Sequence, residues 1–409
     1  MPPKSGQQQR VFYTLKATRE LFDITFFATV NKENLRETQK ELLAISDDVI
    51  LLPSRYSHNI MSKAWNKLIG GFYTLLTGLK FSNYLVGQIE FSPGRLRDAL
   101  DGQEFDCALF EYWHAVESVP YFRNKGIPCV LDMHNILWQS YIKQLNARRF
   151  LPKWWKDWAI LQYQQQEERA WRQFDGVISI NASEYEYTRS KVPNSVTVFY
   201  TPMGTDLSLW PYSWQPLEPP IVAYYGGLGS EHNQQDALLC YELIMPIIWR
   251  EYPNIQLWLI GSNPPEFLLE LAKNDHRVKV TGFVERIQDV LSKVSIVLCP
   301  WSGTYGFRSR LVEVMALGVP VVASSEAVHG MQLEAGRGIF LEETPEHMAR
   351  ACVNLLRQPD FAKHQSRLAR QLVEEKFSYE ITYGKLANYL FEFLKQKKSR
   401  ESISRNVYH

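Results

Sequence analysis

The stretch from Trp301 to Ala323 reads WSGTYGFRSRLVEVMALGVPVVA, a polar loop followed by an amphipathic helix and a buried strand. We expect the helix to open near Phe307, where free backbone amides and the positive end of the helix dipole favour a phosphate. Gly303 and Gly306 carry no side chain, so a bulky ligand can approach the backbone closely. The segment therefore predicts an anion site at the start of the helix.

Three charged residues in this segment sharpen the prediction. Arg308 and Arg310 bring permanent positive charge, with forked donors that suit phosphate oxygens. Glu313 lies three residues after Arg310 on the same helix face, and its carboxylate can accept hydrogen bonds from ribose hydroxyls. Together they indicate a nucleotide diphosphate site. A surface helix on which Arg310 and Glu313 only pair with each other is the alternative.

Short apolar strands alternate with helical stretches along the 409 residues, which is typical of parallel sheets covered by helices on both faces. In the first half we expect strands at residues 22–28, 48–52, 106–110, 128–132, 176–180 and 196–200. In the second half we expect them at 221–225, 256–260, 278–281, 296–299, 319–323 and 338–341. The predicted fold class is α/β, with two doubly wound, Rossmann-like parallel-sheet domains.

Prolines separate the two halves. The segment 201–219 contains Pro202, Pro211, Pro216 and Pro219, a composition that resists both a helix and a central strand. We therefore predict a first domain over 1–200, a linker over 201–219 and a second domain over 220–376. A last helix with a charged tail is expected over 377–409.

The second half resembles the donor-binding domain of the retaining glycosyltransferases of family 4, of the glycosyl transferase group 1 type. The motif residues that carry the resemblance are Gly306, Arg308, Arg310, Glu313, Ala316, Gly318, Pro320, Val321 and Val322. Three further segments agree with it, at residues 221–227, 259–265 and 280–284. The resemblance extends along nearly the whole chain, but it is specific only in the second half.

The resemblance implies a GT-B fold with an interdomain cleft, and a C-terminal helix that crosses back to the first domain. It implies transfer of a sugar from a UDP- or GDP-linked donor, with retention and without a metal ion or another cofactor. Donor-binding roles would fall to Gly6, Gly227, Gly282, Val284, Gly306, Ser309, Arg310 and Glu313. Catalytic roles would fall to His134, Arg308 and Arg310, with the arginines stabilising the leaving diphosphate.

Two histidines follow predicted strands in the first half. His134 comes after the strand at 128–132, at the edge where open α/β sheets bind ligands, and it resembles the family histidine that faces the donor sugar. A structural histidine is the alternative there. His114 follows the strand at 106–110 and is a weaker candidate on the acceptor side.

Two positions depart from the family pattern. Many members carry a first glutamate eight residues before the second, where this chain has Tyr305. Many also carry an Arg-Lys pair early in the second domain, whereas residues 228–236 read LGSEHNQQD. A branch that lacks both features uses a Gly-x-Arg-x-Lys arrangement instead. Arg308 and Arg310 approximate that arrangement, although arginine in place of lysine changes the geometry.

The start of the sequence lacks an expected strand. A doubly wound domain opens with a strand that leads into a glycine turn and a helix, yet here the turn around Gly6 comes first. That strand is central in the usual order, so its loss would leave unpaired backbone and a slot in the core. We expect a native start upstream of Met1 or a shortened chain. A fold that manages without the strand is the alternative.

Composition limits the partners and the compartment. The net charge is +1, from 45 basic and 44 acidic residues, so a nucleic acid is not expected as a partner. The five widely spaced cysteines indicate reduced thiols in a cytoplasmic protein. Residues 60–84 are apolar and basic, which favours either core packing or peripheral contact with the inner face of a membrane. The expected acceptor is a glycan or a lipid-linked glycan, as in polysaccharide biosynthesis.

Two other function classes stay open from sequence alone. A nucleotide-sugar epimerase would need further acid–base groups that face the sugar. A non-catalytic scaffold with the same fold would account for Tyr305 and for the absent strand. The three classes differ in what they need, because a transferase uses donor and acceptor, an epimerase uses the donor alone, and a scaffold uses neither.

Overall fold

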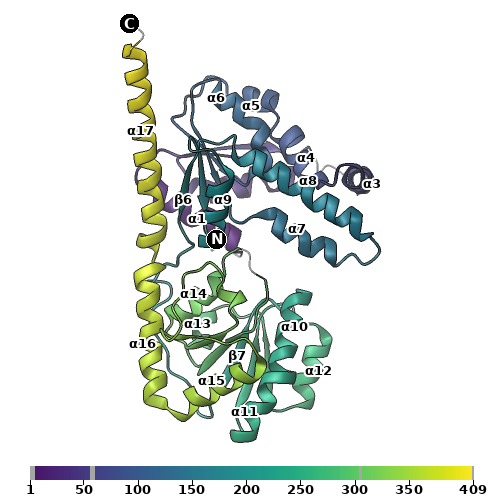
Figure 1. The fold of residues 1–409 in the computed structure, drawn as a ribbon, viewed down its shortest axis with the longest axis vertical. Helices are drawn as coiled ribbons and strands as arrows, with labels where there is room; N and C mark the ends of the chain where they lie inside the picture. Colours follow the sequence, from purple (N-terminus) through teal and green to yellow (C-terminus); the bar gives the residue numbers. More distant parts are fainter. Residues whose placement is uncertain (1–4, 56–59, 304–305, 408–409) are drawn as a thin grey trace. The chain divides into compact units, whose positions relative to one another are not determined.

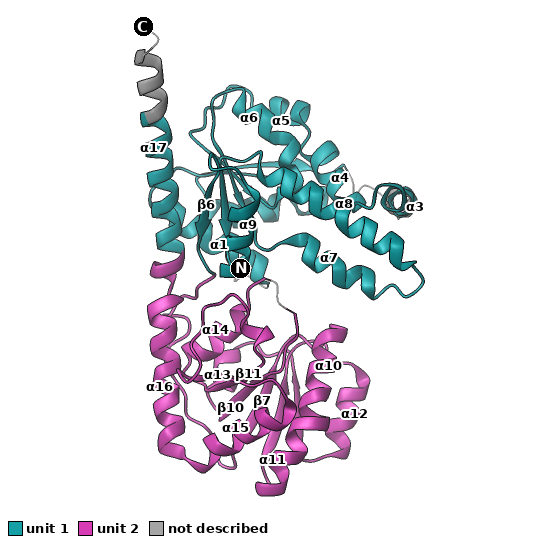
Figure 2. Cartoon of the chain, viewed as in Figure 1, with its two compact units in different colours: residues 1–202, 383–409 teal, residues 203–382 magenta. Residues whose placement is uncertain are grey.

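The computed structural model describes residues 5–55, 60–303 and 306–407 (Figure 1). The chain divides into two compact units, shown in different colours in Figure 2. Unit 1 comprises residues 1–202 and 383–409, and unit 2 comprises residues 203–382. The division therefore places residues 203–219 in unit 2, and the return of the chain to unit 1 falls at Tyr383.

Unit 2 is built on one continuous parallel sheet of six strands, in the order β12-β11-β10-β7-β8-β9. The strands are β7 (Ile221–Tyr225), β8 (Gln256–Ile260), β9 (Val278–Gly282), β10 (Ile296–Cys299), β11 (Val321–Ala323) and β12 (Ile339–Leu341). Strands β10 and β11 are buried along their whole length. These strands can be aliphatic at every position because helices cover both faces of the sheet.

Helices cover this sheet on both faces. They are α10 (Glu231–Leu239), α11 (Met245–Glu251), α12 (Glu266–Asn274), α13 (Ile287–Leu291), α14 (Ser309–Ala316), α15 (Pro345–Arg357) and α16 (Pro359–Lys376), with short turns η4 (Cys240–Ile244) and η5 (Glu326–Val328). Two of them start at hydroxyl caps, since Ser230 accepts from the Asn233 amide and Thr344 from the His347 amide.

The strands of unit 1 form two separate parallel sheets. One has the order β3-β4-β5-β6, from β3 (Ala108–Glu111), β4 (Cys129–Asp132), β5 (Gly176–Ser179) and β6 (Thr197–Tyr200). The other pairs β1 (Thr25–Val30) with β2 (Asp48–Pro53). In the usual doubly wound order, the first strand lies between the strands that correspond to β1 and β3. Among the described residues no strand precedes α1 (Gly6–Thr18), and every residue of β1 is partly exposed.

The remaining helices of unit 1 surround these sheets. They are α2 (Leu35–Leu43), α3 (Ile60–Thr77), α4 (Phe81–Tyr84), α5 (Pro93–Ala99), α6 (Val119–Arg123), α7 (Leu137–Asn146), α8 (Lys153–Trp171), α9 (Ala182–Lys191) and α17 (Lys385–Val407), with short helical segments η1 (Lys32–Asn34), η2 (Leu85–Glu90) and η3 (Trp113–Ser118). The segment η6 (Glu380–Gly384) includes the residues at which the chain passes from unit 2 to unit 1. Helix α17 packs Leu386, Leu390 and Phe393 against Val130 and Ile178 of the sheet. The C-terminal helix thus contributes to the core of unit 1.

Candidate functional site

The loop after β10 leads into α14 at the carboxyl end of the unit 2 sheet. The helix begins at Ser309, two residues after Phe307, near which we expected it to open. The extra loop residues follow from the backbone, because Gly306 has a φ of 74° and Arg308 has non-helical angles. Gly303, with a φ of 100°, donates its amide to the Glu326 carboxylate over 2.6 Å. Tyr305 lies outside the described residues.

Arg308 holds this loop together. Its Nη2 atom donates to the carbonyl oxygens of Ser302 and Gly303, over 3.2 and 3.3 Å. Its guanidinium also lies 6.0 Å from the Trp301 ring. The side chain is half-buried. In this conformation Arg308 therefore orders the loop backbone around the predicted anion site.

Arg310 and Glu313 project from α14 near the end of β7. Arg310 is exposed, with its guanidinium 5.7 Å from the ring of Tyr225. Glu313 is buried. Burial raises the pKa of Tyr225, and the charge of Glu313 raises it further, whereas the charge of Arg310 lowers it. A Cβ built on Gly227 would lie 3.7 Å from the Arg310 Nη2 atom. The structure thus brings Arg310, Glu313 and Gly227 together.

Two residues of this site were missed from sequence. Tyr225 ends β7 and lies beneath Arg310. Asn233 in the first turn of α10 donates its side-chain amide to the Gly227 carbonyl over 2.7 Å, and so fixes the turn after β7. The signal for both was present, since a tyrosine ends an apolar strand and Ser230 marks a helix start three residues before Asn233.

The other predicted donor residues belong to other strands and helices or to the start of α14. Gly282 ends β9 with a φ of 68°, and β9 is the edge strand that β8 separates from β7. Val284 follows it and is half-buried. Ser309 is the first residue of α14, and Gly6 is the first residue of α1 in unit 1. Gly6 is exposed, and Ser5 caps its helix by accepting from the Gln8 amide.

His134 in unit 1 is buried at the carboxyl end of β4. Its backbone has a φ of 55°, in the left-handed region that few non-glycine residues adopt. Its Nε2 atom lies 2.5 Å from Oε2 of Glu111, which ends the neighbouring strand β3. Its ring stacks on Tyr112, with 4.4 Å between ring centroids. His134 is thus held by contacts on its Nε2 edge and on one face.

A buried ion pair lies beside His134. Arg10 of α1 is fully buried and donates through Nε to Asp132 Oδ2 over 2.8 Å, and through its other nitrogens to Thr201. Asp132 is the register partner of Glu111 across β3 and β4. The carboxylates and His134 could offer ligands to a metal ion, since these atoms lie within 4.8 Å of one another. Arg10 already bonds Asp132, however, and supplies a positive charge there.

His114 lies in a different environment. Burial, reinforced by the charge of Lys80, lowers the pKa of His114 to about 4. Its Nε2 atom is buried and has no hydrogen-bond partner among the described residues. His114 is therefore neutral at physiological pH, which suits an acceptor of a hydrogen bond and not a cation.

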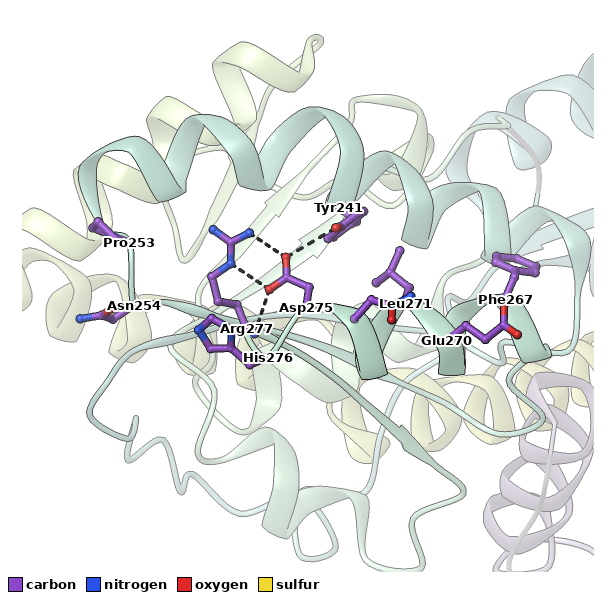
Figure 3. Close-up of a pocket in the computed structure, with 10 residues that line it drawn as sticks. Tyr241, Pro253, Asn254, Phe267, Glu270, Leu271, Asp275, His276 and Arg277 are labelled. Carbon is purple, nitrogen blue, oxygen red and sulfur yellow. Dashed lines mark hydrogen bonds and ion pairs between the residues drawn. The ribbon is translucent and has the colours of Figure 1, made fainter.

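An open pocket of unit 2 lies at the opposite edge of the sheet (Figure 3). It is lined in part by Asp275 and Arg277, which directly precede β9, whereas Gly282 ends that strand. Arg277 makes two side-chain bonds to Asp275 (Figure 3). Its guanidinium also lies 3.8 Å from the centroid of the Trp249 ring. Because the charge of Arg277 is paired with that of Asp275 within the pocket, this surface does not resemble an anion site.

Comparison with known proteins agrees with this geometry. Residues 219–358, which make up most of unit 2, match the family profile described as Glycosyl transferases group 1. A trehalose synthase of Rubrobacter xylanophilus is 32% identical over 117 residues, which are 29% of this chain and 26% of that protein. The predicted resemblance to the group 1 type is confirmed.

Solved structures show the fold of the whole chain. Sucrose-phosphate synthase from Thermosynechococcus elongatus has a TM-score of 0.60 at 18% identity and covers 95% of this chain and 94% of its own. A glycosyltransferase from Rickettsia africae has a TM-score of 0.62 at 15% identity, with 96% of each chain covered. HepE from Anabaena, in complex with UDP and glucose, has a TM-score of 0.59 at 14% identity and covers 95% of this chain and 96% of its own. The chain has the GT-B fold of glycosyltransferases, as predicted.

Proposed function

We propose that the protein transfers a sugar from a nucleotide-sugar donor to an acceptor hydroxyl, with retention at the anomeric carbon. The observation that carries the proposal is the group of Arg310, Glu313, Tyr225 and Gly227 at the carboxyl end of the sheet in a group 1 domain. This edge is where open α/β sheets bind nucleotides. The complex of HepE with UDP favours uridine over guanosine as the base.

In the proposed reaction, negative charge builds on the diphosphate as the bond to the sugar breaks. Arg310, already exposed at the site, and Arg308, on the loop, would stabilise that charge electrostatically without a metal ion. Glu313 would accept hydrogen bonds from the ribose hydroxyls. His134 would face the donor sugar. The acceptor hydroxyl would attack on the face that the diphosphate leaves, so that no side chain becomes a covalent nucleophile.

A calorimetric titration with UDP, GDP and ADP tests the donor site. We expect saturable binding of one nucleotide, lost in Glu313→Ala and kept in Glu346→Ala, an exposed glutamate in the first turn of α15. Arg308→Ala should lower kcat more than it weakens nucleotide binding, because its charge acts on the leaving group. Equal effects on kcat/KM and on binding would contradict that role. The absence of all nucleotide binding in the folded protein would favour the scaffold, and conversion of donor without acceptor would favour the epimerase.

An apolar surface of unit 1 supports a membrane-associated acceptor. Helix α3 exposes Trp65, Leu68, Phe72 and Leu76, the last to 77%. The Trp155 indole of α8 donates to the Leu75 carbonyl, so the start of α8 lies next to the end of α3. Further exposed aromatic and cationic side chains near these helices are Lys67, Arg148, Arg149, Phe150, Lys153 and Trp154. Apolar groups beside cations suit the interface of an anionic bilayer.

We infer from this surface that the acceptor is a lipid-linked glycan at a membrane. Within the described chain, no helix combines the length and the apolar character needed to cross a bilayer. Flotation with vesicles of phosphatidylglycerol and phosphatidylcholine tests the inference. We expect binding that Trp65→Ser with Phe72→Ser abolishes and that Leu209→Ser, an exposed leucine of unit 2, leaves unchanged. Equal flotation of all three proteins would contradict the inference.

A further inference from the structure

Four charged or titratable side chains meet at the carboxyl ends of β3 and β4. Glu111 and Asp132 are register partners on the two strands, Arg10 enters from α1, and His134 follows β4. Arg10 and Asp132 are wholly buried and bonded to each other. His134 is also buried, while the side chain of Glu111 is 28% exposed. The residues pair off as Arg10 with Asp132 and His134 with Glu111.

The charges of this cluster balance only when the second pair holds an extra proton. Arg10 and Asp132 cancel each other, so an ionised Glu111 beside a neutral His134 would leave one negative charge in a partly closed site. Burial raises the pKa of Glu111. Burial also opposes charge on His134, but the hydrogen bond to Glu111 and the charge of Asp132 outweigh it, and the pKa of His134 lies above its ordinary value.

The proton has a consequence for the other ring nitrogen of His134. If it lies on His134, the ring is an imidazolium and both nitrogens carry hydrogen. If it lies on Glu111, the carboxyl donates to Nε2, and the neutral ring must carry its hydrogen on Nδ1. In both arrangements Nδ1 is a donor. Loss of the proton leaves Nε2–H donating to the carboxylate, and Nδ1 becomes an acceptor.

The described contacts of the His134 ring lie at Nε2 and on one face. Tyr112 covers one face of the His134 ring, and Glu111 takes Nε2. Among the described residues no protein group forms a hydrogen bond with Nδ1. Tyr112 and His134 both have positive φ, at 69° and 55°. Backbone of this kind persists where surrounding contacts fix it, and it is enriched at functional sites.

We propose that Glu111 is a positioning residue that shares one proton with His134 Nε2, so that Nδ1 of His134 is held as a hydrogen-bond donor to a hydroxyl oxygen of the transferred sugar. The proposal rests on the proposed function for its substrate. It assigns to Arg10 and Asp132 the task of keeping the cluster neutral without taking up the proton. It also predicts that recognition of the donor sugar depends on pH through His134, whereas binding of the free nucleotide does not.

Nitrogen-15 NMR of histidine-labelled protein tests the shared proton without any substrate. The His134 signals are assigned by their loss in His134→Gln. We expect hydrogen on Nδ1 at pH 7, and titration above the ordinary histidine value of about 6.5. In Glu111→Gln the carboxylate charge is gone, and the titration should move down by about one to three pH units. Glu117→Gln, at an exposed glutamate of η3, should leave it unchanged.

An unprotonated Nδ1 at pH 7 in the unaltered protein, or equal titration of His134 in Glu111→Gln, would overturn the proposal. Circular dichroism of each variant, compared with the unaltered protein, shows whether that variant has kept its fold. Since Glu111→Gln keeps an oxygen that can accept from Nε2, it removes the charge while the ring can stay in place.

Donor kinetics then separate this proposal from the proposed function. We expect kcat/KM for the nucleotide sugar to fall at alkaline pH, with the midpoint of that fall lowered by about one to three pH units in Glu111→Gln. Binding of the free nucleotide should be equal in both proteins. An unmoved midpoint with normal nucleotide binding would refute the role of Glu111 alone. Failure of every nucleotide to bind would refute the proposed function, while the NMR titration would still decide the shared proton.

Discussion

The two units differ in how they bury charge. Among the described residues, unit 1 buries the acidic and basic side chains of Arg10, Glu90, Asp132, His134, Glu167 and Glu184, whereas unit 2 buries those of Asp236 and Glu313. Unit 2 instead surrounds a continuous six-stranded sheet with apolar side chains. The two units therefore place their stability in different interactions. Both units have an apolar core, and we expect buried charge pairs and protonation to contribute more to the stability of unit 1 than to that of unit 2.

The largest effect is expected from breaking the buried pair of unit 1. In Asp132→Asn the Arg10 charge keeps its place in the interior without a counter-charge, because both side chains are fully buried. We expect a loss of about 3 to 5 kcal/mol from the free energy of unfolding of unit 1. Hydrogen exchange measured by mass spectrometry should show faster exchange in β4 and β5, and unchanged exchange in β7 and β8.

Asp157→Asn is the matched control, since Asp157 forms an exposed pair with Lys153 on α8. Surface pairs contribute little to stability, so exchange should stay as in the unaltered protein. Comparable losses in Asp132→Asn and Asp157→Asn would show that burial of the Arg10 pair does not set the stability of unit 1.

In unit 2, a large loss of stability is expected from a change in packing. Gly318 ends the turn after α14 with a φ of 87°, and a Cβ there would lie 2.4 Å from the Tyr212 ring. Gly318→Ala should therefore destabilise unit 2 by about 3 kcal/mol, through both backbone strain and overpacking. Gly102 in unit 1 has a φ of 72° but open space around its Cβ position. Gly102→Ala should cost only about 1 kcal/mol, from strain alone. Urea unfolding followed by unit-resolved exchange measures both, and equal losses would contradict the role of the Tyr212 contact.

The next largest effect is expected on the pH dependence of the stability of unit 1. Glu167 is fully buried and accepts from the amides of Leu137 and Trp138 at the start of α7, and burial raises its pKa to about 8 from 4.5. Between these values the folded state holds a proton that the unfolded state has lost. The free energy of unfolding of unit 1 should therefore fall as pH rises through this window, by about 2 kcal/mol from pH 6 to pH 8.

Hydrogen exchange at several pH values, corrected for intrinsic rates, measures this slope for α7 and α8. Glu167→Gln should flatten it, although the variant loses one of the two acceptors at the start of α7. Glu104→Gln, at an exposed position, should keep it. A slope that survives in Glu167→Gln would assign the pH dependence to another group.

Sequence predicted the strands of both units well. The strands at 129–132, 176–179 and 296–299 are buried along their whole length, and a continuous apolar run is the pattern expected of a strand covered on both faces. Sequence also predicted that no strand comes before the glycine turn at Gly6, and among the described residues none does. The divided sheet of unit 1 is the structural counterpart of that observation.

The contacts between charges could not be predicted in the same way. Glu111 and Asp132 each end an apolar strand, which is a readable signal, but their pairing depends on the register of β3 with β4. The burial of Arg10 depends on α1 lying against both Asp132 and Thr201, residues far away in the sequence. The start of α14 at Ser309 depends on loop bonds of Arg308, which local propensity does not contain.

The smallest effect on stability is expected at Arg310, which has the same side chain as Arg10 in the opposite environment. Arg310 is exposed, so Arg310→Met should change the free energy of unfolding of unit 2 by no more than about 0.5 kcal/mol. The same change should weaken nucleotide binding by about tenfold or more, because a charge-assisted bond to phosphate is lost. Arg250→Met, at an exposed arginine of α11, should change neither quantity. If Arg310→Met destabilised unit 2 as strongly as Asp132→Asn destabilises unit 1, Arg310 would be a structural residue. The contrast between a unit 1 that buries charged side chains and a unit 2 that exposes one to its ligand would then be wrong.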